Sequence, residues 1–291
     1  MILCLVATEY FLRSIPNNYS YKNDYLNTNA QNIEHLFLGS SHAFYGVDPT
    51  YIDGVAFNAS HVSQSIDYDF AIFDKYRQQF LHLKTVIIPA DYGIFFGRTS
   101  VGVESWRVKN YELYYDINRS YKLKNHFELL NFRFAKNLKL ALSHVIDKDT
   151  SLITCTELGY ALESKENENL ILSGQKAAHR HSNIDQKYHE DNIAIIERFV
   201  EYTKKHHIKI LFYTSPAYYS YVDNLDQKEL METQSFFSNI AQINSHCNYY
   251  SFLKDADFNA TDFSDADHLN DLGAKKLSKK LNTLIQKHTR E

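Results

Sequence analysis

Two short stretches, far apart along the chain, carry the residue types of a serine nucleophile and its base. In HLFLGSSHAFYGVDP, residues 35–49, an apolar run ends in Ser40, Ser41 and His42. In FSDADHLNDLGAKKL, residues 263–277, Asp265 precedes His268 by three positions. A serine attacks a carbonyl only when a base takes its proton and a third group orients that base. Because serine is also a good helix cap, Ser41 taken alone is more simply explained as a turn residue.

The second stretch supplies the base that Ser41 needs. His268 stands just before a helical pattern, on what we expect to be a short loop. The three-residue spacing lets the Asp265 carboxylate fold back onto the imidazole Nδ1–H and fix its tautomer. Asp267 could compete for that role, but a directly adjacent residue normally points away. The pair therefore favours a nucleophilic role for Ser41, with His268 as base and Asp265 as its partner.

These residues can meet only if the fold brings the two ends of the chain together. Short apolar runs predict buried parallel strands at residues 35–38, 55–58, 85–89, 208–214 and 249–253. Between them lie helical patterns, the clearest at residues 192–207 and in the last segment of the chain. Alternating strands and helices predict a three-layer α/β/α sandwich around a mostly parallel five-stranded sheet of the flavodoxin-like kind. Catalytic groups of such folds collect on the loops after the strands.

Residues 98–187 fit this alternation poorly, and we interpret them as a helical insertion into a single domain of residues 31–291. A helix is expected within residues 125–145, followed by a polar, weakly patterned tail. The insertion could supply substrate contacts or could simply cover the sheet. Its Trp106, Tyr111, Tyr114 and Tyr115 could stack on a sugar ring, although core packing is the more ordinary role for aromatic residues.

The first 30 residues form a separate N-terminal segment. The run MILCLVATEYFLR is too short to span a bilayer, and no basic stretch precedes it as in a signal peptide. Two interpretations stay open: an ordinary amphipathic first helix, or the last turns of a membrane anchor whose first part is missing. The first would fit a cytoplasmic protein and the second an extracytoplasmic one.

Composition and spacing exclude several classes of function. A formal charge of −4 and a pI near 6.4 argue against nucleic-acid binding. Cys4, Cys155 and Cys247 are too few and too scattered for a disulfide framework. The histidine clusters at residues 179–181 and 204–207 lack the spacing of a zinc site, so we expect neither a metal nor an organic cofactor.

Taken together, the GSS turn, an asparagine after the second strand and the C-terminal DxxHLNxxGA box resemble the SGNH (GDSL-type) hydrolase superfamily. The first block of that family is usually GDS, so the matching nucleophile is Ser41 and not Ser40. The resemblance implies a triad of Ser41, His268 and Asp265. It also implies an oxyanion hole from Asn58, from Ser63, where the family often has glycine, and from the Ser41 backbone. Asn58 could instead cap the following helix, and His42 could bind substrate or serve the turn.

The third block departs from the family pattern. Typical members have a GxND motif whose asparagine donates to the oxyanion, whereas the matching strand here ends VIIPADYGIF, with Asp91. An ionised aspartate cannot donate a hydrogen bond. Either another group completes the hole or the activity differs from that of a plain esterase.

A GSS first block, a missing GxND and a possible N-terminal anchor together resemble superfamily members that serve bacterial cell-envelope polymers, like the proteins that O-acetylate alginate or transfer D-alanine to lipoteichoic acid. Such members often work with a membrane-bound O-acyltransferase on the outer side of the cytoplasmic membrane. The resemblance implies a serine acyl hydrolase or acyltransferase acting on ester, above all O-acetyl, groups of a carbohydrate. The alternatives are a catalytically silent binding or scaffold protein of an envelope-polysaccharide assembly, and an unrelated α/β binding protein in which Ser41 and His268 lie far apart.

Overall fold

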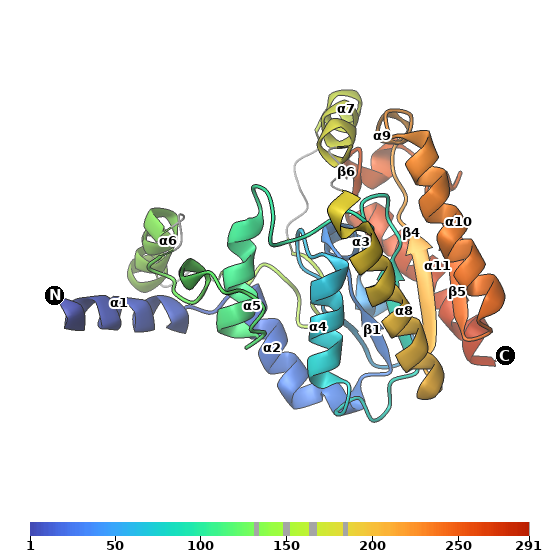
Figure 1. Cartoon of the computed structure of the whole chain (residues 1–291). Helices are drawn as coiled ribbons and strands as arrows, with labels where there is room; N and C mark the ends of the chain where they lie inside the picture. The colour runs from blue at the N-terminus through green and yellow to red at the C-terminus, as the bar shows by residue number, and fades with distance from the viewer. Residues whose placement is uncertain (131–133, 148–151, 163–167, 183–185, 291) are drawn as a thin grey trace.

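Five parallel strands form the central sheet of the computed structural model (Figure 1). They are β1 (His35–Phe37), β2 (Ala56–Asn58), β3 (Thr85–Pro89), β4 (Lys209–Thr214) and β5 (Cys247–Ser251), in the spatial order β2-β1-β3-β4-β5. The structure describes residues 1–130, 134–147, 152–162, 168–182 and 186–290. The strand order matches that of the flavodoxin-like sheet, in which β1 lies between β2 and β3.

Alternate side chains of each strand enter two different cores. Leu36, Val86 and Ile210 belong to the larger core, whereas Phe37, Ile87 and Leu211 belong to the smaller one on the opposite face. The helices that cover the larger core are α2 (Asn18–Asn29), α4 (Ile66–Tyr76), α5 (Val108–Tyr114), α8 (His189–Lys205) and α10 (Gln227–Ile243). The other face is covered by α3 (Ser41–Gly46) and α11 (Asp271–Arg290). The three-layer α/β/α prediction is confirmed.

The bounds of the elements differ from the predicted ones mainly at the edges of the fold. The third strand has the predicted bounds, but β5 begins and ends two residues earlier than expected. Its predicted last residues, Phe252 and Leu253, lie beyond the strand and are buried all the same. The apolar residues therefore predicted where this segment lies in the core, but not which of its residues pair with β4.

The predicted insertion contains several separate helical pieces. They are η3 (Ser105–Arg107), α5, η4 (Leu123–Asn125), α6 (Phe134–Asp147), α7 (Leu170–His181) and η5 (Gln186–Tyr188). The helix expected within residues 125–145 is thus wrong in its first part, since α6 begins only at Phe134, and residues 131–133 lie outside the described part. The tail expected to be weakly patterned contains a full helix, α7. Asn169 caps α7 by accepting from the backbone N–H groups of Ile171 and Leu172.

The remaining elements connect these layers. They are α1 (Ile2–Ser14), η1 (Ala30–Asn32), η2 (Pro49–Tyr51), α9 (Tyr219–Val222), η6 (Ala260–Asp262), β6 (Phe263–Asp265) and β7 (His268–Leu269). In Figure 1, α1 and α6 lie together at one end of the molecule, away from the sheet. The C-terminal strands β6 and β7 form a separate antiparallel pair.

Candidate active site

Strands β1 and β3 are neighbours in the sheet. The chain continues from β1 to β2 on one side of this pair and from β3 to β4 on the other, and the carboxyl ends of β1 and β3 lie together at this point. Open parallel sheets bind ligands in the crevice at such a point. Ser41 begins α3 directly after β1, and Asp91 follows β3. The turn between β1 and α3 requires Gly39, whose φ is +118° and whose missing Cβ would lie 2.4 Å from Pro89 Cγ. The sequence therefore directs Ser41 to the site through a turn that only glycine can make.

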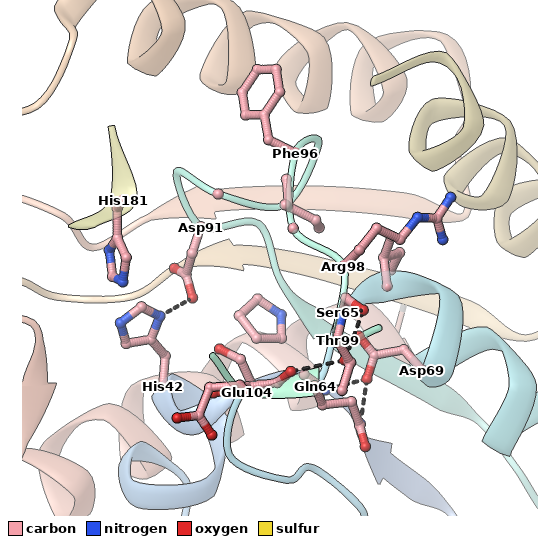
Figure 2. A pocket seen from close by; sticks show the side chains of 18 of the residues that line it. His42, Gln64, Ser65, Asp69, Asp91, Phe96, Arg98, Thr99, Glu104 and His181 are labelled. Carbon is pink, nitrogen blue, oxygen red and sulfur yellow. Dashed lines mark hydrogen bonds and ion pairs between the residues drawn. The ribbon is translucent and has the colours of Figure 1, made fainter. Parts of the chain in front are cut away.

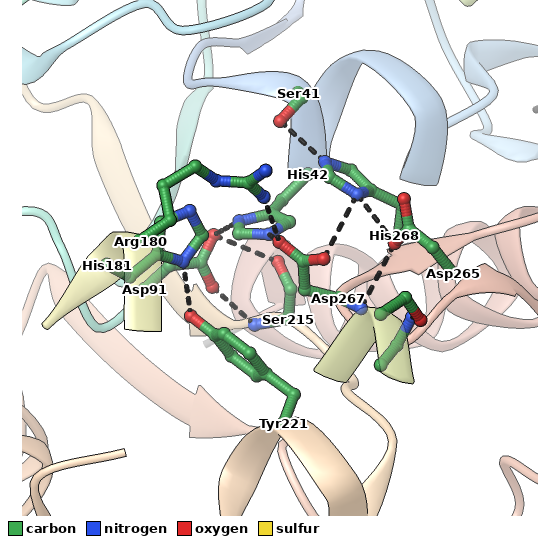
Figure 3. Close-up of polar contacts among 12 residues, drawn as sticks. Ser41, His42, Asp91, Arg180, His181, Ser215, Tyr221, Asp265, Asp267 and His268 are labelled. Atoms are coloured by element: carbon green, nitrogen blue, oxygen red, sulfur yellow. Dashed lines mark hydrogen bonds and ion pairs between the residues drawn. The ribbon is translucent and has the colours of Figure 1, made fainter. Parts of the chain in front are cut away.

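The C-terminal motif reaches Ser41 from the opposite end of the chain. Asp265 and His268 are paired across the β6–β7 hairpin, where we expected a loop. His268 Nδ1 lies 2.8 Å from Asp265 Oδ1, and His268 Nε2 lies 2.8 Å from Ser41 Oγ (Figure 3). Because a carboxylate only accepts, Nδ1 carries the proton and Nε2 accepts from the Ser41 hydroxyl. The three residues form a continuous hydrogen-bonded chain, and all but the serine are buried.

Asp267 lies between two histidines and does not displace Asp265. Its Oδ1 is 3.5 Å from His268 Nδ1, which is longer than the Asp265 contact, and its Oδ2 is 3.7 Å from His42 Nε2. Burial would raise the pKa of Asp267, but His268 and His42 outweigh burial and lower it well below its usual range. Asp267 is therefore a buried carboxylate that both imidazoles stabilise.

Asp91 is paired with His42, the residue that follows Ser41. Its Oδ2 accepts from His42 Nδ1 at 2.8 Å, and its Oδ1 accepts from the Ser215 backbone N–H at 2.8 Å. Burial would lower the pKa of His42, but the carboxylates of Asp91 and Asp267 outweigh it and raise the pKa to about 10. His42 is then an imidazolium at neutral pH, with its ring centroid 5.0 Å from that of His268. The third-block position thus holds an ion pair in place of a neutral amide donor.

Asn58 does not take the predicted oxyanion role. Its side-chain N–H groups donate to the backbone carbonyls of Ala43 and Val47, both at 2.9 Å, and its Oδ1 accepts from Ser60. The side chain is fully buried at the end of β2. Since both donors are used to hold α3 against β2, the assignment of Asn58 to the oxyanion hole is corrected to a structural one.

Ser63 has the backbone geometry that its predicted position suggests. Its φ is +59°, in the left-handed region where glycine is the usual residue. Ser63 and Ser40, the residue before Ser41, both line a cavity of about 320 Å³. Figure 2 shows this cavity from close by. His42 and Asp91 line this cavity as well.

The rest of the cavity wall comes from the α4 loop and from the segment after β3. Ser65 and Thr99 join these two segments through hydrogen bonds of 2.8–3.1 Å, and Arg98 pairs with Asp67 at 3.1 Å. Asp69 accepts from the Gly39 backbone N–H at 2.7 Å. Burial raises the pKa of Asp69 to about 7, although its hydrogen bonds oppose that rise. These hydrogen bonds and the ion pair hold the wall segments together, which makes the cavity a preformed one.

Helix α7 of the insertion contributes residues that sequence reasoning did not assign to the site. Ser173 Oγ accepts from the Ala266 backbone N–H at 3.1 Å, between the two aspartates of the motif. Arg180 lies 3.8 Å from Asp267 Oδ2, and His181 Nδ1 lies 2.8 Å from the Tyr221 hydroxyl. Burial lowers the pKa of His181 to about 4, so this ring is neutral. The cluster at residues 179–181 was visible in the sequence, but only as an unsuitable zinc motif.

The aromatic residues of the insertion lie elsewhere. Tyr111 and Tyr115 are fully buried in the larger core, where Tyr111 stacks on Tyr68 with ring centroids 4.0 Å apart. Trp106 and Tyr114 line a second cavity near α1 and not the one beside Ser41. The sugar-stacking alternative is therefore wrong for the buried tyrosines, which pack in the core.

Among the residues that the structure describes, the one cluster with metal-ligand geometry lies in this same site. The ligating atoms of His42, Asp267 and His268 lie within 4.8 Å of one another. His268 Nδ1 and His42 Nδ1 already bond to Asp265 and Asp91. A cation here would compete with the Asp265 bond, so the cluster fits a hydrogen-bonded acid–base site better than a metal centre.

Comparison with known proteins gives distant structural similarity only. No protein-family model and no curated protein matches the sequence. A solved structure from Bacteroides fragilis, provisionally described as an acylhydrolase, is similar to 90% of this chain and 94% of its own, with a TM-score of 0.45 and 12% identity. A Streptococcus pneumonia protein, provisionally described as a platelet activating factor, is similar over 97% of this chain and 94% of its own, with a TM-score of 0.41 and 10% identity.

Proposed function

We propose that this chain is a serine acyl hydrolase or acyltransferase that acts through Ser41, His268 and Asp265. The observation that carries the proposal is the continuous contact from Ser41 Oγ to His268 Nε2 and from His268 Nδ1 to Asp265, with 2.8 Å at each step. It also argues against an unrelated binding protein, for which a large separation of Ser41 and His268 was expected.

In this mechanism Ser41 Oγ attacks the ester carbonyl while His268 Nε2 takes the hydroxyl proton. The tetrahedral intermediate expels the alcohol as His268 returns that proton to the leaving oxygen, leaving an acyl group on Ser41. Water or a sugar hydroxyl, deprotonated by the same histidine, then takes the acyl group. Asp265 holds the imidazole in the required tautomer and stabilises its charged form.

The oxyanion is assigned to the backbone N–H groups of Ser41 and Ser63. Neither Asn58 nor Asp91 can donate to it, because the first is used elsewhere and the second is a carboxylate. The imidazolium of His42 supplies the compensating electrostatics. Without its charge, Asp91 and Asp267 would leave two uncompensated carboxylates next to a developing negative charge.

For the substrate we propose an acylated, in particular O-acetylated, carbohydrate such as a cell-envelope polymer. The cavity lined by Ser40 and His42, the two neighbours of Ser41, has a volume of about 320 Å³, which suits a short acyl chain better than a long one. The polymer itself, the extracytoplasmic location and cooperation with a membrane-bound O-acyltransferase rest on the resemblance of the GSS and DxxH motifs. A silent scaffold protein is the less favoured alternative, because it would not need the intact acid–base chain.

The test is turnover of p-nitrophenyl acetate and of an acetylated oligosaccharide by the wild type, Ser41→Ala, His268→Ala and the matched control Ser40→Ala. We expect Ser41→Ala and His268→Ala to lose on the order of 10⁴-fold or more in kcat, and Ser40→Ala to stay near wild type. Labelling with a fluorophosphonate should occur at Ser41 and disappear in Ser41→Ala. A wild type that is inert toward all three reagents would sink the proposal and favour the scaffold.

A further inference from the structure

Exposed apolar side chains gather at the end of the molecule formed by α1, residues 121–130 and α6 (Figure 1). We call this set the apolar end. It consists of Met1, Ile2, Leu3, Leu5, Val6, Tyr10, Tyr121, Leu123, Phe127, Leu130, Leu142, Val145 and Ile146. Clustered exposed apolar side chains on a protein surface usually mark a site of contact with another protein or with a membrane.

The first two turns of α1 are exposed on every side. Residues 1–7 are all exposed, with Ile2 at 75% and Leu3 at 82% of their full accessible surface. Because successive residues of a helix are about 100° apart, seven exposed positions cover the whole circumference. A protein partner would bury only one stripe of such a helix. A helix that is apolar all round is suited to a hydrocarbon environment.

The second half of α1 is firmly attached to the rest of the protein, and this attachment holds the exposed first turns of the helix in place. The buried Glu9 carboxylate accepts from the backbone N–H groups of Glu128 and Leu129, both at 2.9 Å, and from Arg13 at 2.7 Å. Arg13 in turn donates to the His126 carbonyl at 2.7 Å. Leu12 packs with Leu129 in a small separate core. These contacts hold α1 and the 121–130 segment together as one surface.

The charge around the apolar end is positive. Among the side chains of residues 1–15, 119–130 and α6 that the structure describes, five are basic and two are acidic: Arg13, Arg119, Lys122, Lys124 and Lys139 against Glu9 and Glu128. Both acidic side chains are buried, whereas Lys122, Lys124 and Lys139 are exposed. This is opposite to the formal charge of −4 of the whole chain. Apolar side chains flanked by lysines suit the interface of an anionic bilayer.

We propose that the apolar end inserts into the interfacial region of a bilayer that contains anionic lipids. In the part of the chain that the structure describes, no helix is long and apolar enough to cross a membrane. In this proposal the first turns of α1 lie among the acyl chains and the exposed lysines lie at the headgroups. The proposal depends on α1 and its surroundings and not on the acyl chemistry.

The test is flotation of the purified full chain with vesicles of phosphatidylcholine alone and of phosphatidylcholine with 30% phosphatidylglycerol. The variants are Leu3→Glu with Val6→Glu, and Lys122→Ala with Lys124→Ala. Ile243→Glu, at an exposed apolar position at the end of α10, is the matched control. Circular dichroism checks that each variant is folded, and sedimentation without lipid reports self-association.

We expect binding to the anionic vesicles that the Leu3→Glu, Val6→Glu double variant abolishes and Ile243→Glu leaves unchanged. Each lysine removed should weaken binding about fivefold. Added salt should also weaken binding, progressively as its concentration rises. Absence of vesicle binding by the wild type, or equal binding by the glutamate double variant, would overturn the proposal. So would lipid-independent dimerisation that the double variant abolishes, since a second copy would then be the occupant.

Discussion

His42 Nδ1 and Asp91 Oδ2 lie 2.8 Å apart and form an ion pair next to Ser41. Asp91 in turn accepts from the Ser215 backbone N–H, so its carboxylate is held at both oxygens. The pair keeps the positive charge of His42 next to Ser41. The same pairing compensates the Asp91 carboxylate, whose negative charge would otherwise repel an oxyanion. His42, which directly follows Ser41, thus carries the positive charge that compensates the Asp91 carboxylate.

Asp91→Asn tests this relationship. The variant keeps an acceptor for Ser215 but removes the charge that raises the pKa of His42, so that pKa should fall from about 10 toward neutrality, as NMR titration of the His42 ring would report. We expect kcat/KM for p-nitrophenyl acetate to fall on the order of 100-fold at pH 8, where His42 would lose its charge. Ser215→Ala, which removes only the 3.2 Å hydroxyl contact, is the control. A gain in activity would mean that an asparagine serves this site better and that the ion pair is not catalytic.

The same histidine predicts a pH dependence of stability. Its pKa is raised from 6.5 to about 10 in the folded state, so the folded chain binds the proton more tightly than the unfolded chain. The stabilisation is fully present below about pH 6.5 and is lost as the pH rises through about 10. Relative to His42→Gln, the free energy of unfolding of the wild type should decline across this window by up to about 1.4 kcal/mol per pH unit. Urea unfolding at pH 6.5, 8 and 9.5 measures it, and parallel curves for the two proteins would contradict the pairing.

Asp265 and Asp267 should differ in their effect on catalysis, because only Asp265 lies within hydrogen-bond distance of His268 Nδ1. Asp265→Asn presents an amide that can leave His268 in the wrong tautomer, and kcat should fall on the order of 10⁴-fold. Asp267→Asn removes a carboxylate that neutralises both histidines, so its kcat should fall far less, by about 10-fold, with a lower His42 pKa. Steady-state kinetics of both variants at pH 8 decide the matter. Equal losses would show that the two carboxylates act as one unit.

The sheet and the contact of His268 with Asp265 could be predicted because each depends on residues that are close together in the sequence. Buried parallel strands are continuous apolar runs, and a DxxH spacing brings a carboxylate and an imidazole together whatever surrounds them. The order of the strands also puts the end of β1 at the ligand-binding crevice, where Ser41 lies. These features depend on residues close together in sequence or on general rules of topology.

The rest of the site depends on contacts between distant segments, which one sequence does not reveal. Asn58 had the right residue type for an oxyanion donor, but the position of α3 brought the Ala43 and Val47 carbonyls to its amide. Ser173 and Arg180 lie on α7, in a stretch whose polar composition suggested no regular structure. Their roles follow only from the packing of α7 against the C-terminal hairpin.

The structural role of Asn58 leads to the last prediction. Asn58→Ala removes the side-chain partner of the Val47 carbonyl and of the Ser60 donors and leaves the Ala43 carbonyl with only the Val47 N–H, which should lower the free energy of unfolding by about 2–4 kcal/mol. The folded variant should keep kcat within about tenfold of wild type, since loss of an oxyanion donor typically costs about 10²–10³-fold. Ser60→Ala, which removes a single hydroxyl contact, should be only mildly destabilised. Thermal unfolding and kinetics on the same preparations separate the two roles: an unchanged melting temperature with a 100-fold loss of kcat would restore Asn58 to the oxyanion hole and require α3 to move during the reaction.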